Sequence, residues 1–352
     1  MKTRLLIFAI LMLAAVGKMS AQGTLLGENQ LRALKSYTTV EDALANKNDA
    51  KVLDLSGQGL STIPTEVSQL KDLQMIYLQG NQLTTIPAQL LALPNLQYLY
   101  MDNNQIVAIP DNIKNLSKLK VLSLGGNKIR LVPEPLTTLA SLQSLNLAAN
   151  QLASLPASIK GLTALSELDL SVNQLKELPK EIGSLKNIKV LQATDNKLSS
   201  VPKELRNLVK ITILKLDNNP LGTIDEAITS LPNLRILTMA QCGIATIPAS
   251  IANLKRLRNI DLHGNQIKSM NPLYSMASLE TVNMDGNQLS YIDNGIGEMK
   301  SLRMLNIRNN KQIKEIREQL NELDNLTELA RSGTSAEMVP TKLETTQEGI
   351  AY

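Results

Sequence analysis

Residues 73–87 read LQMIYLQGNQLTTIP, and residues 96–110, 23 positions later, read LQYLYMDNNQIVAIP. Both stretches fit the spacing L-x-x-L-x-L-x-x-N-x-L-x-x-I-P, which recurs until the chain is nearly finished. A period of this length, kept through most of a chain, indicates stacked repeats rather than a globular core. The 12 copies begin at Ala50, Leu73, Leu96, Leu119, Leu142, Leu165, Ile188, Ile211, Leu234, Leu257, Leu279 and Leu302.

Each copy predicts one short strand around its L-x-L segment. Alternate side chains of a strand point to opposite faces, so a pair such as Leu145 and Leu147 faces the interior and its neighbours face outward. In most copies an aliphatic residue and a proline follow, and the fixed φ of proline suits the entry to a helical turn. Ile182 and Leu185, spaced i, i+3 after Pro179, are then expected to pack against the sheet.

These copies resemble the leucine-rich repeats of the 23-residue class. The resemblance implies an α/β fold, a curved leucine-rich-repeat solenoid or horseshoe. A parallel concave sheet of about 12 short strands would line the inside, and short helical or 3-10 turns would form the convex side. It also implies that the concave sheet is the usual site for a partner.

One polar position recurs where each strand turns away from the sheet. An amide carries both donors and an acceptor, so stacked asparagines can satisfy buried backbone groups there. Gln58 fills the position in the first copy, and Cys242 fills it in the ninth, which the resemblance allows and which favours a structural role for this thiol. The predicted structural ladder comprises Asn81, Asn104, Asn127, Asn150, Asn173, Asn196, Asn219, Cys242, Asn265, Asn287 and Asn310.

The first 21 residues predict a secretory signal peptide. Lys2 and Arg4 form a basic start, residues 5–16 are an apolar run, and Ala21 is a small residue before the expected cut. A cut after Gly17 is the alternative, and an uncleaved anchor is the competing interpretation. The apolar run is too short to cross a bilayer as a helix, so we expect no membrane span in the mature chain.

The remaining segments divide around the repeats. Residues 22–49 lack the 23-residue pattern and predict an N-terminal helical cap, with one amphipathic helix at 28–35 and a second after the capping-box spacing at 38–41. Such a cap would cover the open end of the core. Residues 50–325 hold the repeats, residues 326–343 a degenerate C-terminal capping repeat, and residues 344–352 a polar tail.

Charge and cysteine content narrow the class of protein. Removing residues 1–21 takes away three of the 36 basic residues and none of the 32 acids, which leaves a net charge of 33 − 32 = +1. This balance argues against a nucleic-acid partner. Cys242 is the only cysteine, so no intrachain disulfide can form. Animal secreted leucine-rich-repeat proteins usually have cysteine-rich caps, so we expect an exported bacterial protein, periplasmic, cell-surface or secreted.

No residue pattern predicts an enzyme. His263 is the only histidine, which excludes histidine triads and multi-histidine metal sites, and it is expected to face solvent. Glycine-rich phosphate loops are absent from the sequence. We therefore expect no catalytic residues, no metal and no cofactor. The outward acids Glu167, Asp169, Asp195, Asp217, Asp261 and Asp285 lack the spacing of a known calcium loop and are expected to be solvated.

A tyrosine patch on the second and third copies is the predicted binding site. Outward residues of neighbouring strands lie about 5 Å apart, so these side chains should touch. Tyrosine offers apolar area and a hydroxyl, as binding hot spots require, although strand surfaces also favour tyrosine for structural reasons. The patch comprises Met75, Tyr77, Gln79, Tyr98, Tyr100 and Asp102.

Three functions are consistent with these features. The first is a non-enzymatic, exported recognition scaffold that binds a protein or peptide partner on the concave sheet. The second is a glycan-binding or adhesion module that uses the same tyrosines to stack on sugars. The third follows from similarity to intracellular Ras-group leucine-rich-repeat scaffolds, and it requires that residues 1–21 are not a signal.

Overall fold

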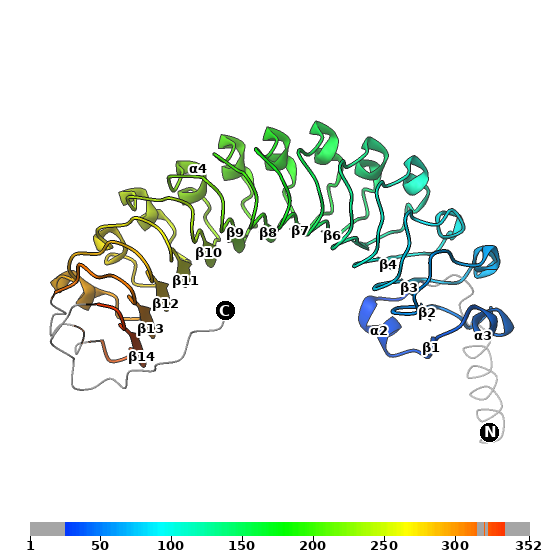
Figure 1. The fold of residues 1–352 in the computed structure, drawn as a ribbon, viewed down its shortest axis with the longest axis horizontal. Coiled ribbons are helices and arrows are strands. Elements are labelled where there is room, and N and C mark those ends of the chain that lie inside the picture. Colours follow the sequence, from blue (N-terminus) through cyan, green and yellow to red (C-terminus); the bar gives the residue numbers. More distant parts are fainter. Residues whose placement is uncertain (1–24, 315–319, 321–322, 335–352) are drawn as a thin grey trace, which may run out of the picture.

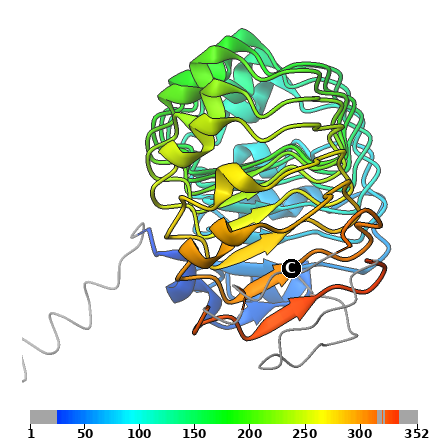
Figure 2. The same ribbon diagram turned by 90° about the vertical axis from the view of Figure 1, so that its left-hand side faces the viewer.

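The computed structural model describes residues 25–314, 320 and 323–334. The predicted signal segment (1–21), the polar tail (344–352) and residues 335–343 of the predicted C-terminal cap lie outside the described residues. Within them the chain forms a curved coil whose strands line the inner, concave side and whose short helical turns line the outer, convex side (Figures 1 and 2). The predicted leucine-rich-repeat solenoid architecture is therefore confirmed.

The concave side is a 14-stranded parallel sheet in which the strands follow one another in sequence order. The repeat phase keeps the register constant: Leu53 pairs with Ile76, and Ile76 with Leu99. Two short strands at the ends, β1 and β14, extend the predicted set of about 12. The strands are β1 Ser36–Tyr37, β2 Val52–Asp54, β3 Met75–Tyr77, β4 Tyr98–Tyr100, β5 Val121–Ser123, β6 Ser144–Asn146, β7 Glu167–Asp169, β8 Val190–Gln192, β9 Ile213–Lys215, β10 Ile236–Thr238, β11 Asn259–Asp261, β12 Thr281–Asn283, β13 Met304–Asn306 and β14 Glu328–Ala330.

The convex side consists mainly of single 3-10 turns that follow proline. Pro179, for example, has φ −65° at the entry to η6, and Ile182 within that turn is buried in the core. These turns are η1 Thr65–Gln69, η2 Leu90–Ala92, η3 Asp111–Asn115, η4 Glu134–Thr138, η5 Ala157–Gly161, η6 Lys180–Ser184, η7 Lys203–Asn207, η8 Ala249–Asn253, η9 Asn271–Leu273 and η10 Asn294–Glu298.

One convex turn is an α-helix instead, α4 (Glu226–Thr229). Asp225 stands there in place of proline, and its carboxylate accepts a hydrogen bond from the Ala227 backbone N–H at 2.7 Å. An acidic side chain at this position satisfies a free N–H of the first turn, which proline cannot do. Asp293 caps η10 in the same way and that turn remains 3-10, so the aspartate cap alone does not determine the type of helix.

A buried asparagine follows each strand from β3 to β13 except β10, where Cys242 takes its place, and it bonds to the backbone of neighbouring coils. Asn150 is typical: its Oδ1 accepts from the Ile129 N–H at 2.9 Å, and its Nδ2 donates to the carbonyls of Leu124 and Leu147 at 2.9 and 3.1 Å. The residue before each of these asparagines turns the chain with a left-handed φ, even where it is not glycine, as at Val172 (φ 55°). The asparagines thus hold one coil to the next.

Between residue 25 and the first repeat the chain forms two helices, and they occupy different surfaces. In α3 (Val40–Ala45), Thr39 caps the helix by accepting from the Asp42 N–H at 3.1 Å, and the buried residues Val40 and Ala43 join the main core. By contrast, α2 (Glu28–Arg32) lies inside the curve, on the concave side of the sheet (Figure 1). The predicted helix at 28–35 is thus shorter than expected and does not cover the end of the core.

One continuous aliphatic core runs through the coil from Tyr37 to Leu329. A second, separate cluster joins Leu31 of α2 to Val52, Met75 and Tyr98 on the concave face. No helix among the described residues is long and apolar enough to cross a membrane. The first cluster stabilises the solenoid, and the second fixes α2 to it.

Candidate recognition surface

The concave face is built from rows of side chains that run across the strands. The first and third residues of each strand face the inside of the curve, while the middle residue, such as Leu99, is buried in the core. Because the strands are parallel and in register, equivalent residues pair directly: Met75 with Tyr98, and Tyr77 with Tyr100. The predicted grouping of these four side chains is therefore observed.

Their predicted exposure is wrong for two of them. Met75 is 0% exposed and Tyr98 is 4% exposed. Both face the concave side as expected, but α2 covers them, and its Leu31 is itself 0% exposed in the same cluster. The physical reason is apolar burial: the patch that could anchor a partner already anchors a segment of the same chain.

Two glutamines hold the chain just before α2 by its backbone. Oε1 of Gln74 accepts a hydrogen bond from the Leu26 N–H at 2.9 Å, and Nε2 of Gln97 donates to the Leu26 carbonyl at 3.1 Å. The two amides also bond to each other at 2.9 Å, and both side chains are buried. This pair therefore binds both the backbone N–H and the backbone carbonyl of one residue, Leu26.

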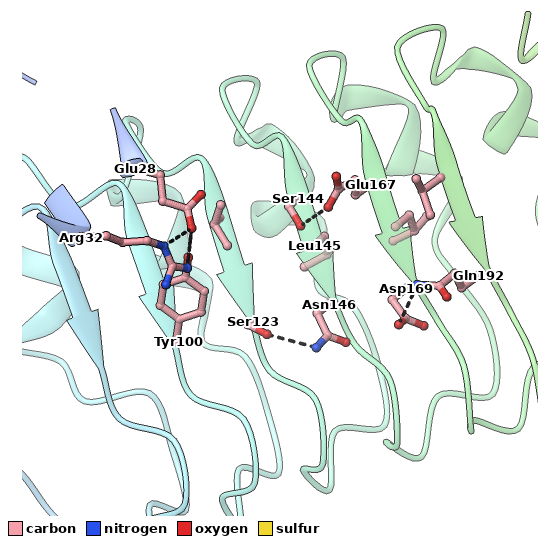
Figure 3. Close-up of a pocket in the computed structure, with 13 residues that line it drawn as sticks. Glu28, Arg32, Tyr100, Ser123, Ser144, Leu145, Asn146, Glu167, Asp169 and Gln192 are labelled. Atoms are coloured by element: carbon pink, nitrogen blue, oxygen red, sulfur yellow. Dashed lines mark hydrogen bonds and ion pairs between the residues drawn. The ribbon is translucent and has the colours of Figure 1, made fainter. Parts of the chain in front are cut away.

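The other two tyrosines remain half-buried at the edge of α2. The rings of Tyr77 and Tyr100 stack with centroids 5.0 Å apart and planes 12° apart. The Tyr100 hydroxyl donates to Oε1 of Glu28 at 2.9 Å, and Arg32 donates to the same oxygen at 2.6 Å (Figure 3). Burial, followed by the Glu28 carboxylate, raises the pKa of Tyr100 far above its ordinary value. The hydroxyl therefore stays protonated as a hydrogen-bond donor.

The two polar members of the predicted patch are also half-buried. Asp102 is bound within the sheet: its Oδ1 accepts from the Ser123 hydroxyl at 2.6 Å, from the Gly125 N–H at 2.9 Å and from Asn146 Nδ2 at 3.1 Å. Gln79 lies two positions after Tyr77, just beyond the end of β3. A binding role for Tyr77, Gln79, Tyr100 and Asp102 stays a prediction.

Beside α2 the concave face is hollowed. A cavity of about 370 Å³ lies between Glu28 and Arg32 on one side and Glu167 and Asp169 on the other (Figure 3). Small and polar side chains form its floor, and they are partly bonded to one another: Asn146 Nδ2 donates to the Ser123 hydroxyl at 3.0 Å. The lining residues are Glu28, Arg32, Tyr100, Val121, Ser123, Ser144, Leu145, Asn146, Glu167, Leu168, Asp169, Val190 and Gln192.

The repeat pattern does not predict this cavity because one of its walls comes from α2. Nothing in the local pattern of residues 28–32 places that helix on the sheet, since the residues it packs against, Val52, Met75 and Tyr98, lie in the first three repeats. The sequence offered one indication of this contact: an amphipathic helix precedes repeats whose first outward strand residues are apolar.

The chemically reactive residues do not form a catalytic group. His263 is half-exposed and its Nδ1 lies 2.9 Å from Oδ1 of Asp261, a hydrogen bond that raises the pKa of the imidazole. Cys242 is buried, its thiol donates to the Leu216 carbonyl at 3.3 Å, and burial raises its pKa to about 11. Among the residues that the structure describes, no three potential ligands form a metal-binding group.

Comparisons with known proteins agree with this architecture. The family model described as a leucine-rich repeat region matches residues 41–134, 109–227 and 222–346. The comparison with curated proteins gives no match. A leucine-rich-repeat protein of Leptospira interrogans is 28% identical with a TM-score of 0.67, over 86% of this chain and 95% of that one.

Two further solved structures share the fold at lower identity. An internalin of Listeria monocytogenes is 22% identical with a TM-score of 0.74, over 96% of this chain and 93% of that one. A plant peptide hormone receptor, solved in complex with RGF2, is 22% identical with a TM-score of 0.64, over 88% of this chain and 57% of that one. With the family model matching most of its length, this chain belongs to the leucine-rich-repeat family.

Proposed function

We propose that the protein is a non-enzymatic, exported recognition scaffold that binds a protein or peptide partner on its concave sheet. The observation that carries this proposal is the cavity beside α2, which takes side chains from five consecutive strands, β4–β8, and from the helix itself. Sheet side chains bonded into networks give a surface that changes little on binding, and this lowers the ordering cost of association.

The chemistry of the cavity favours a peptide-like ligand. Arg32 stands on one side as an ion pair with Glu28 at 2.6 Å, while Glu167 and Asp169 stand on the other, so the far end of the cavity carries the excess negative charge. Ser144 and Asn146 between them offer hydrogen-bonding groups of both kinds. The plant receptor of the same fold was solved with its partner RGF2, which is consistent with this mode of use.

The glycan alternative has less support from the geometry. Sugar binding by stacking requires open tyrosine ring faces, but Tyr98 is buried, and Tyr77 and Tyr100 each present one face to the other. The Arg32 guanidinium also lies 5.9 Å from the centre of the Tyr100 ring. We therefore propose a protein or peptide partner, and a glycan array tests the alternative directly.

Export is part of the proposal and rests on residues 1–21. Mass spectrometry of the protein recovered from its own cells should find a chain that begins at Gln22 or Lys18. An intact Met1 in the cytoplasm would contradict export and would favour the intracellular scaffold similar to the Ras-group proteins. This result is independent of where the partner binds.

The binding site is tested by filling the cavity. Ser144 is half-exposed on the cavity floor, so Ser144→Trp should block a partner while the buried core is unchanged. Ser184→Trp on the exposed convex side is the matched control. Quantitative mass spectrometry of proteins captured from an envelope extract should show a species lost with Ser144→Trp and kept with Ser184→Trp. Identical captured proteins for both variants would contradict the proposed site.

A further inference from the structure

The first residues of the strands form one row across the concave face, and this row contains two runs of adjacent apolar residues. Near the N-terminus it runs through Val52, Met75, Tyr98 and Val121, and α2 covers it there. After Ser144 and Glu167 it becomes apolar again on three adjacent strands. This second run, which we call the aliphatic row, comprises Val190, Ile213 and Ile236.

The aliphatic row is continuous, and its side chains stay partly exposed among the residues that the structure describes. Val190 pairs directly with Ile213, and Ile213 with Ile236, in the parallel register of β8–β10 (Figure 1). With strands about 4.8 Å apart, the three side chains span roughly 10 Å. Each is half-exposed, and none belongs to the two buried clusters. Val190 also lines the cavity beside α2, so the row continues the proposed site.

The contact of α2 with the first apolar run shows what kind of segment can pack on such residues. There, a single Leu31 side chain is fully buried against Val52, Met75 and Tyr98. The position just before each strand supplies the polar contacts, since Gln74 and Gln97 bind the Leu26 backbone. A short segment with one aliphatic anchor is therefore a sufficient occupant for three apolar residues of this row.

At the aliphatic row the same preceding position is basic before two of the three strands. It holds Lys189 before β8 and Arg235 before β10, both exposed, and the neutral Thr212 before β9. Arg235 also lines a second hollow of about 320 Å³, together with three further cations: Lys255 and Arg256 at the end of the same repeat and Arg258 in the next one. Its lining residues are Arg235, Lys255, Arg256, Arg258, Ser278, Glu280 and Ser301.

Little negative charge within this hollow offsets the cations. Glu280 is the one acid among the lining residues, and it pairs with Arg258 at 2.7 Å. Arg256 donates to the Asn233 amide oxygen at 2.7 Å, and this neutral partner does not offset the positive charge of Arg256. The aliphatic row is thus bordered by an edge that attracts carboxylates.

We infer that the aliphatic row and its basic edge dock an acidic amphipathic segment of a protein partner. An aliphatic side chain of that segment packs on Val190, Ile213 and Ile236, and its carboxylates meet Lys189, Arg235 and the hollow behind Arg235. This inference rests on the proposed function and adds the chemistry of the partner. A pure polyanion would use the basic edge but would leave the aliphatic row exposed to water.

Selection from a displayed library of short random peptides on the mature protein tests this inference. Enriched peptides should combine aspartate or glutamate with leucine, isoleucine or valine. A labelled selected peptide should bind at least about tenfold more weakly to Ile213→Ser and to Arg235→Glu, as measured by fluorescence anisotropy. Lys203→Glu, an exposed charge reversal on the convex turn η7, should leave binding unchanged.

The outcomes separate this inference from the proposed function. Selected peptides without acidic residues, or peptides insensitive to Ile213→Ser, would overturn the inference, and their loss of binding to Ser144→Trp would still support the cavity. Heparin binding that depends on Arg235, with no peptide enrichment, would overturn it in favour of a polyanion. If no peptide binds any variant and envelope capture is also negative, both proposals fail.

Discussion

Replacing Asn150 by leucine tests the hydrogen bonds that join neighbouring coils. The substitution keeps a side chain of similar size in a buried position, so the main loss is polar. Asn150 accepts from the Ile129 N–H and donates to the carbonyls of Leu124 and Leu147. The cost depends on which of these backbone groups find another partner.

The carbonyls keep a partner after the substitution, whereas the N–H does not. Leu124 also accepts from Asn127, and Leu147 also accepts from Asn173, because neighbouring asparagines share each carbonyl. The Ile129 N–H has only the Asn150 side chain as its acceptor, and Ile129 is 0% exposed. One orphaned buried N–H predicts a loss of about 1–3 kcal/mol in the free energy of unfolding.

Thermal unfolding followed by far-ultraviolet circular dichroism measures this loss. For a folded region of about 300 residues, the unfolding entropy converts that range into a melting temperature lower by about 2–5 °C. Asn115→Leu, at an exposed position of η3, should leave the melting temperature unchanged. An Asn150→Leu variant that melts with the unsubstituted protein would refute the structural role of the asparagine ladder.

Three further predictions concern strain, the docking of α2 and pH. Val172→Asn should raise the free energy of unfolding by about 1 kcal/mol, because asparagine tolerates the left-handed φ of 55° better than a β-branched residue. Leu31→Asp should release α2, since a charge cannot replace the fully buried anchor, and trypsin should then cleave faster after Arg32. The hydrogen bond to Asp261 raises the pKa of His263, so the imidazole should titrate above its ordinary value near 6.5 in NMR spectra.

Each of these three predictions has a control variant or an outcome that would contradict it. Leu34→Asp changes an exposed leucine just after α2 and should leave trypsin cleavage unaltered. His263 is the only histidine, so its resonance is unambiguous. Titration at the ordinary pKa would contradict the hydrogen bond to Asp261. Because the pKa of His263 is raised in the folded protein, the stability that its protonated form gains from Asp261 is fully present below about pH 6.5. This stability is lost as the pH rises through the pKa of the folded state. An unchanged or lower stability of Val172→Asn would exclude strain there.

The repeat phase predicted which side chains of each copy face the core. Counting in steps of 23 places Leu53, Ile76 and Leu99 on one buried line, and the structure pairs them in that order. This works because each coil contacts only its neighbours, so local spacing determines the packing. The end strands β1 and β14 were harder to predict because the flanking segments depart from the repeat.

The position of α2 could not be predicted from spacing. The apolar side of residues 28–32 is equally suited to the open end of the core and to an apolar patch on the sheet. The choice depends on Leu31 meeting Met75 and Tyr98 in space, contacts between residues more than forty positions apart. The tyrosine patch was therefore placed on the correct face, but its covering helix was not foreseen.

Site-specific photo-cross-linking tests the concave surface as the site of recognition most directly. A photoreactive residue at Gln192, half-exposed in the cavity, should form an adduct with the partner, and the same residue at Lys160 on the exposed convex turn η5 should not. Peptide mapping of the adduct identifies the contacting segment of the partner. Adducts that form from Lys160 and not from Gln192 would contradict recognition on the concave sheet.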